Sequence, residues 1–569
     1  MERRVFIAVL MSFVVLYTYQ TYFAPPPPDT PPAGSKPIPA TAAAPAAGSA
    51  PSAASAPAAP ATTPSEPAPV SVLGETQPRE ITVETATVRV VFSNRGARAV
   101  RWQLKHYRDT GDQLVDLVPS GLPDSEPRPF SLQVDDAKET ERLNTAMYRV
   151  TGDQAGTLDA SRGEPLVFEF QDENGLSARK EFRFDPTTYT LTATVTVRRG
   201  DTPLNPAIVW GPGLGDQGAA AGGGSIFTGN AVMPPRALIH HGGEITRLTP
   251  EDAAEAPRQP GPFRFVGVDD HYFVSFAVSD LNGTAEYRPL MLPGATEGEQ
   301  RRLLAYTLKP ATPGEPIRFF VGPKQFDELQ ALGPDYTRAI DFGIFAWLVV
   351  PLLSTLKWLF RFTGNYGWSI ILLTIVINLV MFPLRHKSSV AMRKMQAIQP
   401  QMKLIQERYS HLKMTDPGRQ KMQEEVTALY RERGVNPASG CLPLVLTLPV
   451  LMAFYSLLAG SIELRGAPFA GWLRDLSAAD PYFVLPSLMG LTMFWQQKVT
   501  PTTADPAQQR VMMVMPVMFT AMMLFSASGV VLYWFVSQVW AIGQQYLTNW
   551  MVPLAAPAKP PAAAARRAK

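Results

Sequence analysis

Residues 366–384 read YGWSIILLTIVINLVMFPL, and this uncharged stretch decides the class of protein. About 20 apolar residues are what a helix needs to cross the hydrocarbon layer of a membrane. Four further stretches of similar composition follow it, so we predict an α-helical, polytopic membrane core over 366–550. The expected spans of this core are 366–384, 441–460, 482–497, 511–526 and 530–548.

The chain also begins with an apolar stretch. Residues 5–23 are uncharged and follow Arg3 and Arg4. A cleaved signal peptide is the alternative, but the stretch runs into YFAPPPP without a small-residue cleavage pattern. We therefore expect residues 1–23 to be an uncleaved signal anchor, which brings the number of transmembrane helices to six. The two arginines place its N-terminus in the cytoplasm.

Residues 24–70 consist almost entirely of Pro, Ala, Ser, Thr and Gly, and carry 15 of the chain's 55 prolines. Such a composition cannot bury enough apolar surface to offset the entropy of ordering, so we expect a disordered tether.

Residues 71–325 show the period of two that is typical of strands, as in TLTATVTV at 190–197, with turn signals at Asn94-Arg-Gly and Glu173-Asn-Gly. Strands without helical stretches between them predict a large antiparallel β-sandwich outside the membrane. The glycine-rich stretch 211–224 lacks the Lys and Ser/Thr of a phosphate-binding loop and is interpreted as an ordinary loop.

The chemistry of an enzyme or a cofactor protein is not indicated. The single Cys excludes an internal disulfide and a cysteine-clustered zinc site. A paired acid and base is not evident in the β domain, so we expect neither a cofactor nor catalysis.

Charge is distributed unevenly along the chain. Residues 71–341 hold 28 basic and 37 acidic residues, whereas residues 385–437 hold 11 basic and 5 acidic ones. The positive-inside rule places 385–437 in the cytoplasm and the β domain on the other side. If 342–360 also crossed the membrane, the basic segment 385–437 and the acidic β domain would lie on the same side. We therefore expect an interfacial helix within 326–365.

Residues 385–437 have the pattern of two amphipathic helices joined at Asp416-Pro-Gly, that is, a cytoplasmic hairpin. A basic face beside phospholipid accounts for the charge equally well. The methionines of the hairpin favour a surface that accepts varied apolar partners. They include Met392, Met395, Met402 and Met422.

The fifth span is also rich in methionine, and for any one residue lipid-facing filler is the simpler interpretation. Six in one span favour a compliant surface along which a client segment slides. These residues are Met512, Met513, Met515, Met518, Met522 and Met523.

Polar residues occupy positions where hydrocarbon is expected. Thr374 and Asn378 are four residues apart and share one helix face, and Thr447 lies in the third span. Interhelical hydrogen bonding explains such residues, and so does a shared water-filled cavity. Both interpretations stay open.

Six motifs occur in order between residues 340 and 550, and together they resemble the YidC/Oxa/Alb family of membrane-protein insertases. They are Gly364-Asn-Tyr-Gly-Trp-Ser-Ile, Met381-Phe-Pro-Leu, Met395-Gln-Ala-Ile-Gln-Pro, Val435-Asn-Pro-Ala-Ser-Gly-Cys-Leu-Pro, Glu463-Leu-Arg-Gly-Ala-Pro-Phe and Gly529-Val-Val-Leu-Tyr-Trp. The anchor, tether and β domain further resemble the Gram-negative members.

The resemblance implies a five-helix insertase core with a hydrophilic groove open to the cytoplasm and to lipid, and a periplasmic β-supersandwich. It also implies an inner-membrane location, membrane-protein clients, phospholipid contact and cooperation with the Sec translocon. The basic tail 551–569 suggests a weak electrostatic contact with the ribosome. By motif, the groove residues are Thr374, Asn378, Thr447 and Trp534.

One position departs from the family pattern. Family members usually carry a basic residue five positions before Pro383, where this chain has Asn378. Arg385, seven residues further on, is the candidate that supplies charge at the mouth of the groove. A channel or secondary transporter is the alternative function, but no repeat of broken helices supports it. A carbohydrate enzyme is a further alternative.

Overall fold

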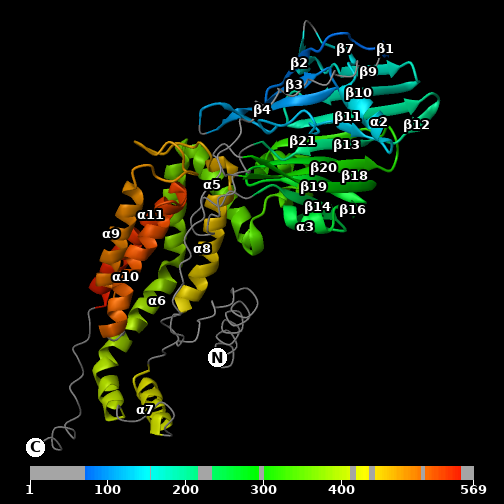
Figure 1. Cartoon of the computed structure of the whole chain (residues 1–569). Coiled ribbons are helices and arrows are strands. Elements are labelled where there is room, and N and C mark those ends of the chain that lie inside the picture. The colour runs from blue at the N-terminus through cyan, green and yellow to red at the C-terminus, as the bar shows by residue number, and fades with distance from the viewer. Residues whose placement is uncertain are drawn as a thin grey trace, which may run out of the picture. The chain divides into compact units, whose positions relative to one another are not determined.

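A computed structural model of the chain is shown in Figure 1. The structure describes residues 71–552 except 110, 154–155, 216–233, 294–299, 410–417, 435–441 and 501–505. The predicted anchor 1–23, the tether 24–70 and most of the tail 551–569 lie outside the described residues, as does most of the glycine-rich stretch.

In the described part of the chain, residues 71–323 form three sheets, which we call the β domain (Figure 1). The largest sheet has the order β1-β9-β10-β11-β21-β18-β17-β14-β15, with β12 paired to β11 and β7 paired to β9. Its strands are β1 (Ser71–Leu73), β7 (Arg149–Thr151), β9 (Leu166–Asp172), β10 (Leu176–Phe184), β11 (Thr190–Arg199), β12 (Thr202–Leu204), β14 (Arg236–His241), β15 (Glu244–Leu248), β17 (Phe263–Asp269), β18 (Phe273–Leu281) and β21 (Ile317–Pro323).

The two smaller sheets have five strands each. The first, in the order β16-β19-β20-β13-β6, consists of β6 (Ser131–Gln133), β13 (Ala207–Pro212), β16 (Arg258–Pro260), β19 (Gly283–Pro293) and β20 (Gln300–Pro310). The second, in the order β5-β4-β3-β2-β8, consists of β2 (Glu80–Glu84), β3 (Val88–Ser93), β4 (Arg98–Arg108), β5 (Leu114–Asp116) and β8 (Thr157–Asp159). All pairings are antiparallel except that of β2 with β8.

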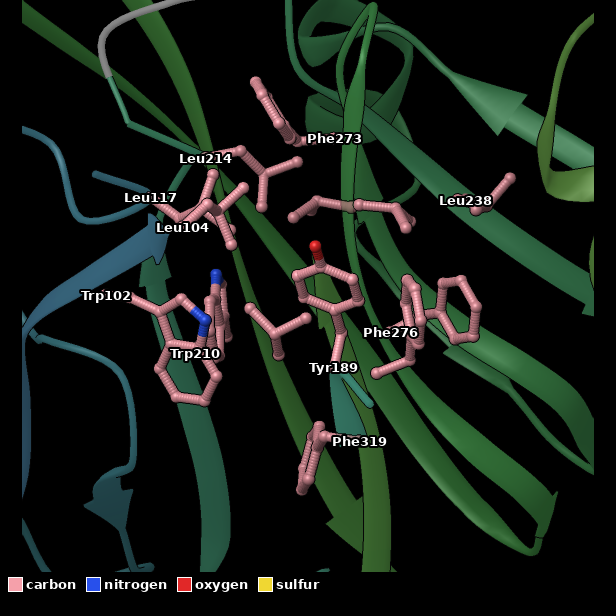
Figure 2. Packing of buried hydrophobic residues seen from close by; sticks show 14 of the residues in the cluster. Trp102, Leu104, Leu117, Tyr189, Trp210, Leu214, Leu238, Phe273, Phe276 and Phe319 are labelled. Atoms are coloured by element: carbon pink, nitrogen blue, oxygen red, sulfur yellow. The ribbon is translucent and has the colours of Figure 1, made fainter. Parts of the chain in front are cut away.

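Alternation of buried and exposed side chains explains the sheets. Along β10, every second residue is buried and the others face outward. The inward residues form an aromatic core, part of which is drawn in Figure 2. There the Trp102 and Trp210 rings meet edge to face with centroids 5.7 Å apart. Such contacts add to the free energy gained by burying the rings.

Residues 81–91 alternate in the sequence like a single strand but form a hairpin. Thr85 Oγ1 accepts hydrogen bonds from the backbone N–H groups of Thr87 and Val88, at 3.1 and 2.9 Å, and turns the chain. The strands β2 and β3 on either side pair antiparallel. A turn held by a Thr hydroxyl is short, so the alternation of apolar and polar residues continues almost unchanged through it.

The prediction that no helices lie among the strands is wrong. Side-chain caps account for two of the short helices. Asp136 accepts from the N–H groups of Lys138 and Glu139, and Thr249 forms a capping box with Asp252. Between the strands lie α2 (Ala137–Thr145), η1 (Ala160–Arg162) and α3 (Pro250–Glu255). After β21 follow α4 (Phe326–Leu332), η2 (Pro334–Ala339) and η3 (Gly343–Phe345).

The rest of the described chain is helical, and we call it the helical core. It contains α5 (Ala346–Thr363), α6 (Tyr366–Arg408), α7 (Gly418–Glu432), α8 (Leu442–Gly460), η5 (Ile462–Leu464), α9 (Val484–Val499), α10 (Pro506–Met523) and α11 (Ser528–Met551). By length and composition, Gly343–Thr363 and Tyr366–Arg408 are able to cross a membrane; Leu448–Gly460 and Met512–Met523 are shorter apolar stretches.

The predicted boundary at residue 384 is absent, because α6 is one helix of 43 residues that runs through Pro383 and Pro400. The expected span and the first arm of the hairpin are therefore continuous. Helix α7 is the second arm, and the predicted turn at Asp416-Pro lies outside the described residues. The fifth span is longer than predicted, since α10 begins at Pro506.

Aromatic and small residues fix the neighbours of α11. The Phe454 ring of α8 stacks on Tyr533 at 4.2 Å, and the Phe519 ring of α10 lies 4.6 Å from that of Trp534. Between α9 and α10, a Cβ at Gly490 would lie 2.2 Å from Thr520 Oγ1, so a larger residue there would have to displace the Thr520 side chain. Helix α11 also contacts α6 and α9.

The end of α8 and the loop that follows it contact the β domain. His271 Nε2 lies 2.9 Å from the carbonyl oxygen of Ala459. The guanidinium of Arg465 lies over the rings of Tyr272 and Phe273, at 5.1 and 5.2 Å from their centroids. Cation–π contacts of a partly buried arginine stabilise such a junction by about 1 kcal/mol each.

Candidate functional site

Polar side chains follow one another along the contact between α6 and α11. We call this set the polar seam. It consists of Thr374, Asn378, Arg385, His386 and Arg393 on α6, and of Ser537, Gln544 and Thr548 on α11. Three of the five predicted groove residues belong to it.

Thr374 and Asn378 lie on one face of α6 as predicted, and both are buried, with 0% and 2% of their surface exposed. Thr374 Oγ1 donates to the carbonyl oxygen of Ile370 at 2.6 Å, and Asn378 Nδ2 donates to that of Thr374 at 2.8 Å. The same Nδ2 lies 3.5 Å from Ser537 Oγ on α11. Both side chains therefore bond mainly within their own helix.

Arg385 covers Asn378. Its Nη1 donates to Asn378 Oδ1 at 2.7 Å, although the two residues are about two turns apart and Pro383 lies between them. The Arg385 side chain is half-buried. Among the residues that the structure describes, no carboxylate pairs with this guanidinium, so its hydrogen-bond partner is a neutral amide and its charge is not compensated.

The seam continues beyond Arg385 toward the hairpin. His386 Nδ1 lies 3.1 Å from Thr548 Oγ1, and Gln544 Nε2 donates to the carbonyl oxygen of Phe382 at 3.4 Å. Arg393, which is 7% exposed, donates to the carbonyl oxygen of Val552 directly after α11. These contacts attach the first arm of the hairpin to the end of α11.

Sequence reasoning missed His386, Arg393, Gln544 and Thr548. The available signal was the spacing: polar residues recur about every seven positions on α6, at 378, 385 and 393, and on α11, at 537 and 544. Seven residues are close to two helical turns, so each set forms a stripe along one side of its helix. Two such stripes facing each other form a seam.

Trp534 lies outside the seam. It is half-buried on α11, and its ring packs on Phe519 of α10. Thr447 lies in α8 at a position where the structure describes no side chain. Of the predicted groove residues whose side chains the structure describes, Thr374, Asn378 and Arg385 lie together, whereas Trp534 lies apart from them.

The methionines of α10 are divided between the surface and the bundle. Met512, Met513, Met515 and Met518 are 39%, 50%, 51% and 60% exposed. Met522 is half-buried and Met523 is 3% exposed, so the end of α10 packs inward. The exposed methionines form an apolar surface suited to lipid or to a client helix.

The predicted client-contacting methionines of the hairpin are only partly exposed. Met392, Met395, Met402 and Met422 are all half-buried. Tyr430 of α7 donates its hydroxyl to Met402 Sδ at 3.1 Å, and Arg408 pairs with Glu425 at 3.2 Å. Part of the methionine surface therefore holds the two arms of the hairpin together.

In the part of the chain that the structure describes, no group of three or more His, Cys, Asp or Glu side chains is placed to hold a metal ion. The most deeply buried ion pair of the β domain is Lys324 with Asp269, 3.0 Å apart. Arg236 also pairs with Asp269, at 3.4 Å. This network joins β14, β17 and the end of β21, so a structural role accounts for it.

Comparisons with known proteins cover nearly the whole chain. A family described as "60Kd inner membrane protein" matches residues 358–554, and one described as "YidC periplasmic domain" matches residues 80–355. The membrane protein insertase YidC of Geobacter metallireducens is 34% identical over 566 residues, which is 96% of this chain and 98% of that protein. Its counterpart in Pelobacter propionicus is 33% identical over 580 residues, with coverages of 97% and 100%.

Solved structures were compared as well. A crystal structure of an active YidC insertase with the first transmembrane domain resolved aligns with a TM-score of 0.35 and 18% identity. The alignment covers 84% of this chain and 93% of that chain.

Proposed function

The chain belongs to the YidC family of membrane protein insertases, and from this premise we propose that Arg385 receives the polar flank of the client. As an insertase it acts on membrane-protein clients, and the family is not a known class of enzymes. The observation that carries the proposal is the 2.7 Å hydrogen bond from Arg385 to Asn378.

The electrostatic argument rests on the half-buried position of Arg385. Two opposite charges about 4 Å apart attract by roughly 1 kcal/mol in water and by roughly 4 kcal/mol at an effective dielectric constant near 20. Since Arg385 has no carboxylate partner among the described residues, an acidic client flank gains this attraction without displacing an existing ion pair. Asn378 positions the guanidinium and leaves its charge uncompensated.

The client's apolar segment leaves along α10. Its exposed methionines, Met512, Met515 and Met518, offer contacts to side chains of varied shape. Transfer of the segment into lipid supplies the free energy, about 0.8 kcal/mol for each CH₂ group removed from water. The seam therefore lowers the barrier for the polar flank, while lipid stabilises the product.

We further propose the membrane arrangement: an inner-membrane protein with six spans, both termini and the hairpin in the cytoplasm, and the β domain in the periplasm. The position of α5 supports its interfacial role. Trp347 and Phe362 are 71% and 72% exposed, while Lys357 pairs with Asp327 of α4, directly after the β domain. An ion pair of this kind is favoured at the interface and costly in hydrocarbon.

Partners beyond the client follow from the family resemblance. We propose that the protein acts alone on small clients and beside the Sec translocon on larger ones, with phospholipid receiving the inserted segment. Basic residues of the tail 551–569 are proposed to contact the ribosome electrostatically.

The test is reconstitution into liposomes with a small two-span client, scored as protease-protected insertion. Two clients are compared, one with an acidic flank and one with that flank neutralised. Arg385→Gln is expected to slow the acidic client about tenfold, which corresponds to a loss of about 1.4 kcal/mol, and to leave the neutral client nearly unchanged. Lys387→Gln is the matched control, because Lys387 is exposed and only two residues away. An equal effect on both clients would refute the proposed role of the charge.

A further inference from the structure

The first residue of β4 is a buried arginine without a partner. Arg98 has 9% of its surface exposed, and its Nε is fully enclosed without a hydrogen bond. Among the described residues, no carboxylate or carbonyl oxygen accepts from this guanidinium. Enclosing a polar nitrogen of a guanidinium without an acceptor costs free energy, which a bound acceptor would recover.

Further basic groups surround Arg98. Ala99 donates its N–H to the carbonyl oxygen of Pro129 at 3.0 Å, which places the start of β4 directly beside Arg128. After burial itself, the charges of Arg128 and Arg95 are the next causes that lower the pKa of Arg98, and only Asp124 opposes them. Asp124 is 83% exposed and lies 4.0 Å from Arg128, so it compensates little of this charge.

Lys180 adds a fourth cation behind these residues. Its Nζ is completely buried and donates to the carbonyl oxygens of Gly96, Ala97 and Phe130, at 2.7, 3.1 and 2.8 Å. All three acceptors belong to the two segments that carry Arg98 and Arg128. Lys180 therefore fixes the spacing of these segments and has no donor left for a carboxylate.

The sign of this cluster is opposite to that of its surroundings. Residues 71–341 are acidic overall, with 37 acidic against 28 basic residues. Arg128 pairs with Asp124 and donates to the carbonyl oxygen of Leu122 at 3.4 Å, so Arg98 is the buried member of this cluster without a partner among the described residues. Stability alone does not explain this arginine, because a hydrophobic residue of similar volume at position 98 would be less costly. A bound anion supplies the missing charge and the missing acceptors.

We propose that Arg95, Arg98 and Arg128 form a binding site for a phosphate group, which is either free inorganic phosphate or the phosphodiester of a lipid headgroup. The planar guanidinium matches two phosphate oxygens at once, and several arginines around one phosphate are a common arrangement. Arg98 is the buried member of this set, the Arg128 side chain is 18% exposed, and Arg95 is exposed, so a phosphate group would reach Arg98 from the side of Arg95 and Arg128.

The test uses the full chain, delipidated in an uncharged detergent. Thermal unfolding is followed by the fluorescence of buried tryptophans such as Trp102, four residues from Arg98 on β4. Inorganic phosphate is expected to raise Tm saturably, by about 3 °C at tenfold its Kd, compared with sodium chloride at equal ionic strength. An equal response to chloride, or no response, would overturn the proposal.

Arg98→Gln tests the enclosed guanidinium. This variant is expected to lose the phosphate response and, without phosphate, to have a Tm equal to or above that of the wild type, because an uncompensated charge has been removed. A merely structural Arg98 predicts the opposite, namely a lower Tm in phosphate-free buffer. Arg128→Gln should weaken the phosphate response at least several-fold, whereas Arg101→Gln, an exposed arginine on the same strand, should retain it in full.

Nanodiscs distinguish the two sources of phosphate. If the headgroup is the ligand, phosphatidylglycerol discs should abolish the response to added phosphate, while discs of an uncharged galactolipid, which contains no phosphate, should preserve it. If free phosphate is the ligand, both discs should preserve the response. A phosphate response that survives Arg98→Gln in any of these settings rejects the site.

Discussion

Arg385 donates to Asn378 Oδ1 at 2.7 Å, across two turns of the same helix. Asn378 Nδ2 donates to the carbonyl oxygen of Thr374 at 2.8 Å, and this bond turns the amide so that its oxygen faces Arg385. The amide thus acts as a support for the guanidinium. The positive charge that the family resemblance places at residue 378 lies instead on a side chain that reaches back toward that residue.

Exchanging the two residues tests this relationship. The double variant Asn378→Arg with Arg385→Asn returns the charge to position 378 and keeps a neutral partner seven residues on. We expect it to insert the acidic client within about threefold of the wild-type rate, that is, within roughly 0.7 kcal/mol. The single variant Asn378→Arg places two guanidinium groups together, and their repulsion should lower both stability and insertion. A double variant as slow as Arg385→Gln would contradict the exchange.

The attachment of the hairpin to α11 gives a different prediction. Arg393 is buried and donates to the carbonyl oxygen of Val552, so Arg393→Met releases the first arm of the hairpin from the end of α11. A hydrogen bond from a charged group is worth about 1.5–3 kcal/mol, so amide exchange across 394–409 should quicken at least tenfold. Hydrogen exchange with mass spectrometry measures this.

Insertion by Arg393→Met should fall for acidic and neutral clients alike, because the position of the hairpin, and not the charge of the seam, has changed. Lys394→Met is the control, since Lys394 is exposed at the adjacent position. If only the insertion of the acidic client fell, Arg393 would instead be assigned to client recognition.

Lys180 is expected to stabilise the β domain through its three buried hydrogen bonds. Lys180→Met keeps the length of the side chain but leaves the carbonyl oxygens of Gly96, Ala97 and Phe130 without this donor. At about 1 kcal/mol or more for each buried group, the free energy of unfolding should fall by about 3 kcal/mol. Denaturant unfolding of the full chain checks this value against Lys138→Met, an exposed lysine on α2. An unchanged free energy would mean that the three carbonyl oxygens are satisfied without Lys180.

Much of the architecture was predictable because it depends on local periodicity. The alternation along residues 190–197 predicts a strand, and β11 contains all of them. The turns at Asn94-Arg-Gly and Glu173-Asn-Gly also fall between strands, with Gly96 and Gly175 at φ values of 73° and 80°. Left-handed backbone of this kind is specified by glycine itself, without tertiary contacts.

Features that depend on tertiary contacts were not predictable in the same way. Pro383 suggests a helix end, but packing of α6 against α11 keeps the helix continuous to Arg408. Likewise, the residue that supports Arg385 could not be identified from spacing, because a side chain can point either way along its helix. The identity of the partner, Asn378, emerges only once both side chains are placed.

Asp270 makes the stability of the β domain depend on pH. Its carboxyl is completely buried and accepts from the N–H groups of Tyr272 and Phe273, at 2.8 and 2.6 Å. Burial raises its pKa from 3.8 to about 6; the two N–H groups and the charge of Lys324 limit the rise, and the charge of Asp269 adds to it. Between these pH values the folded chain holds a proton that the unfolded chain has lost, so this residue's contribution to stability falls as pH rises from about 4 to about 6.

Asp270→Asn should remove that dependence, since the amide oxygen still accepts the two N–H groups but does not ionise. At pH 7.5 the variant is expected to be more stable than the wild type, by up to about 3 kcal/mol, and the difference should shrink toward zero near pH 4. Denaturant unfolding of the full chain from pH 4 to 7.5 measures the free energy of unfolding of both proteins. Other titrating groups such as His271 are present in both, so their contributions largely cancel in the difference. Asp201→Asn, at an exposed position, is the control and should show no trend. A difference between Asp270→Asn and the wild type that is constant with pH, or that grows toward pH 4, would show that Asp270 is ionised throughout and stabilises the fold as a carboxylate.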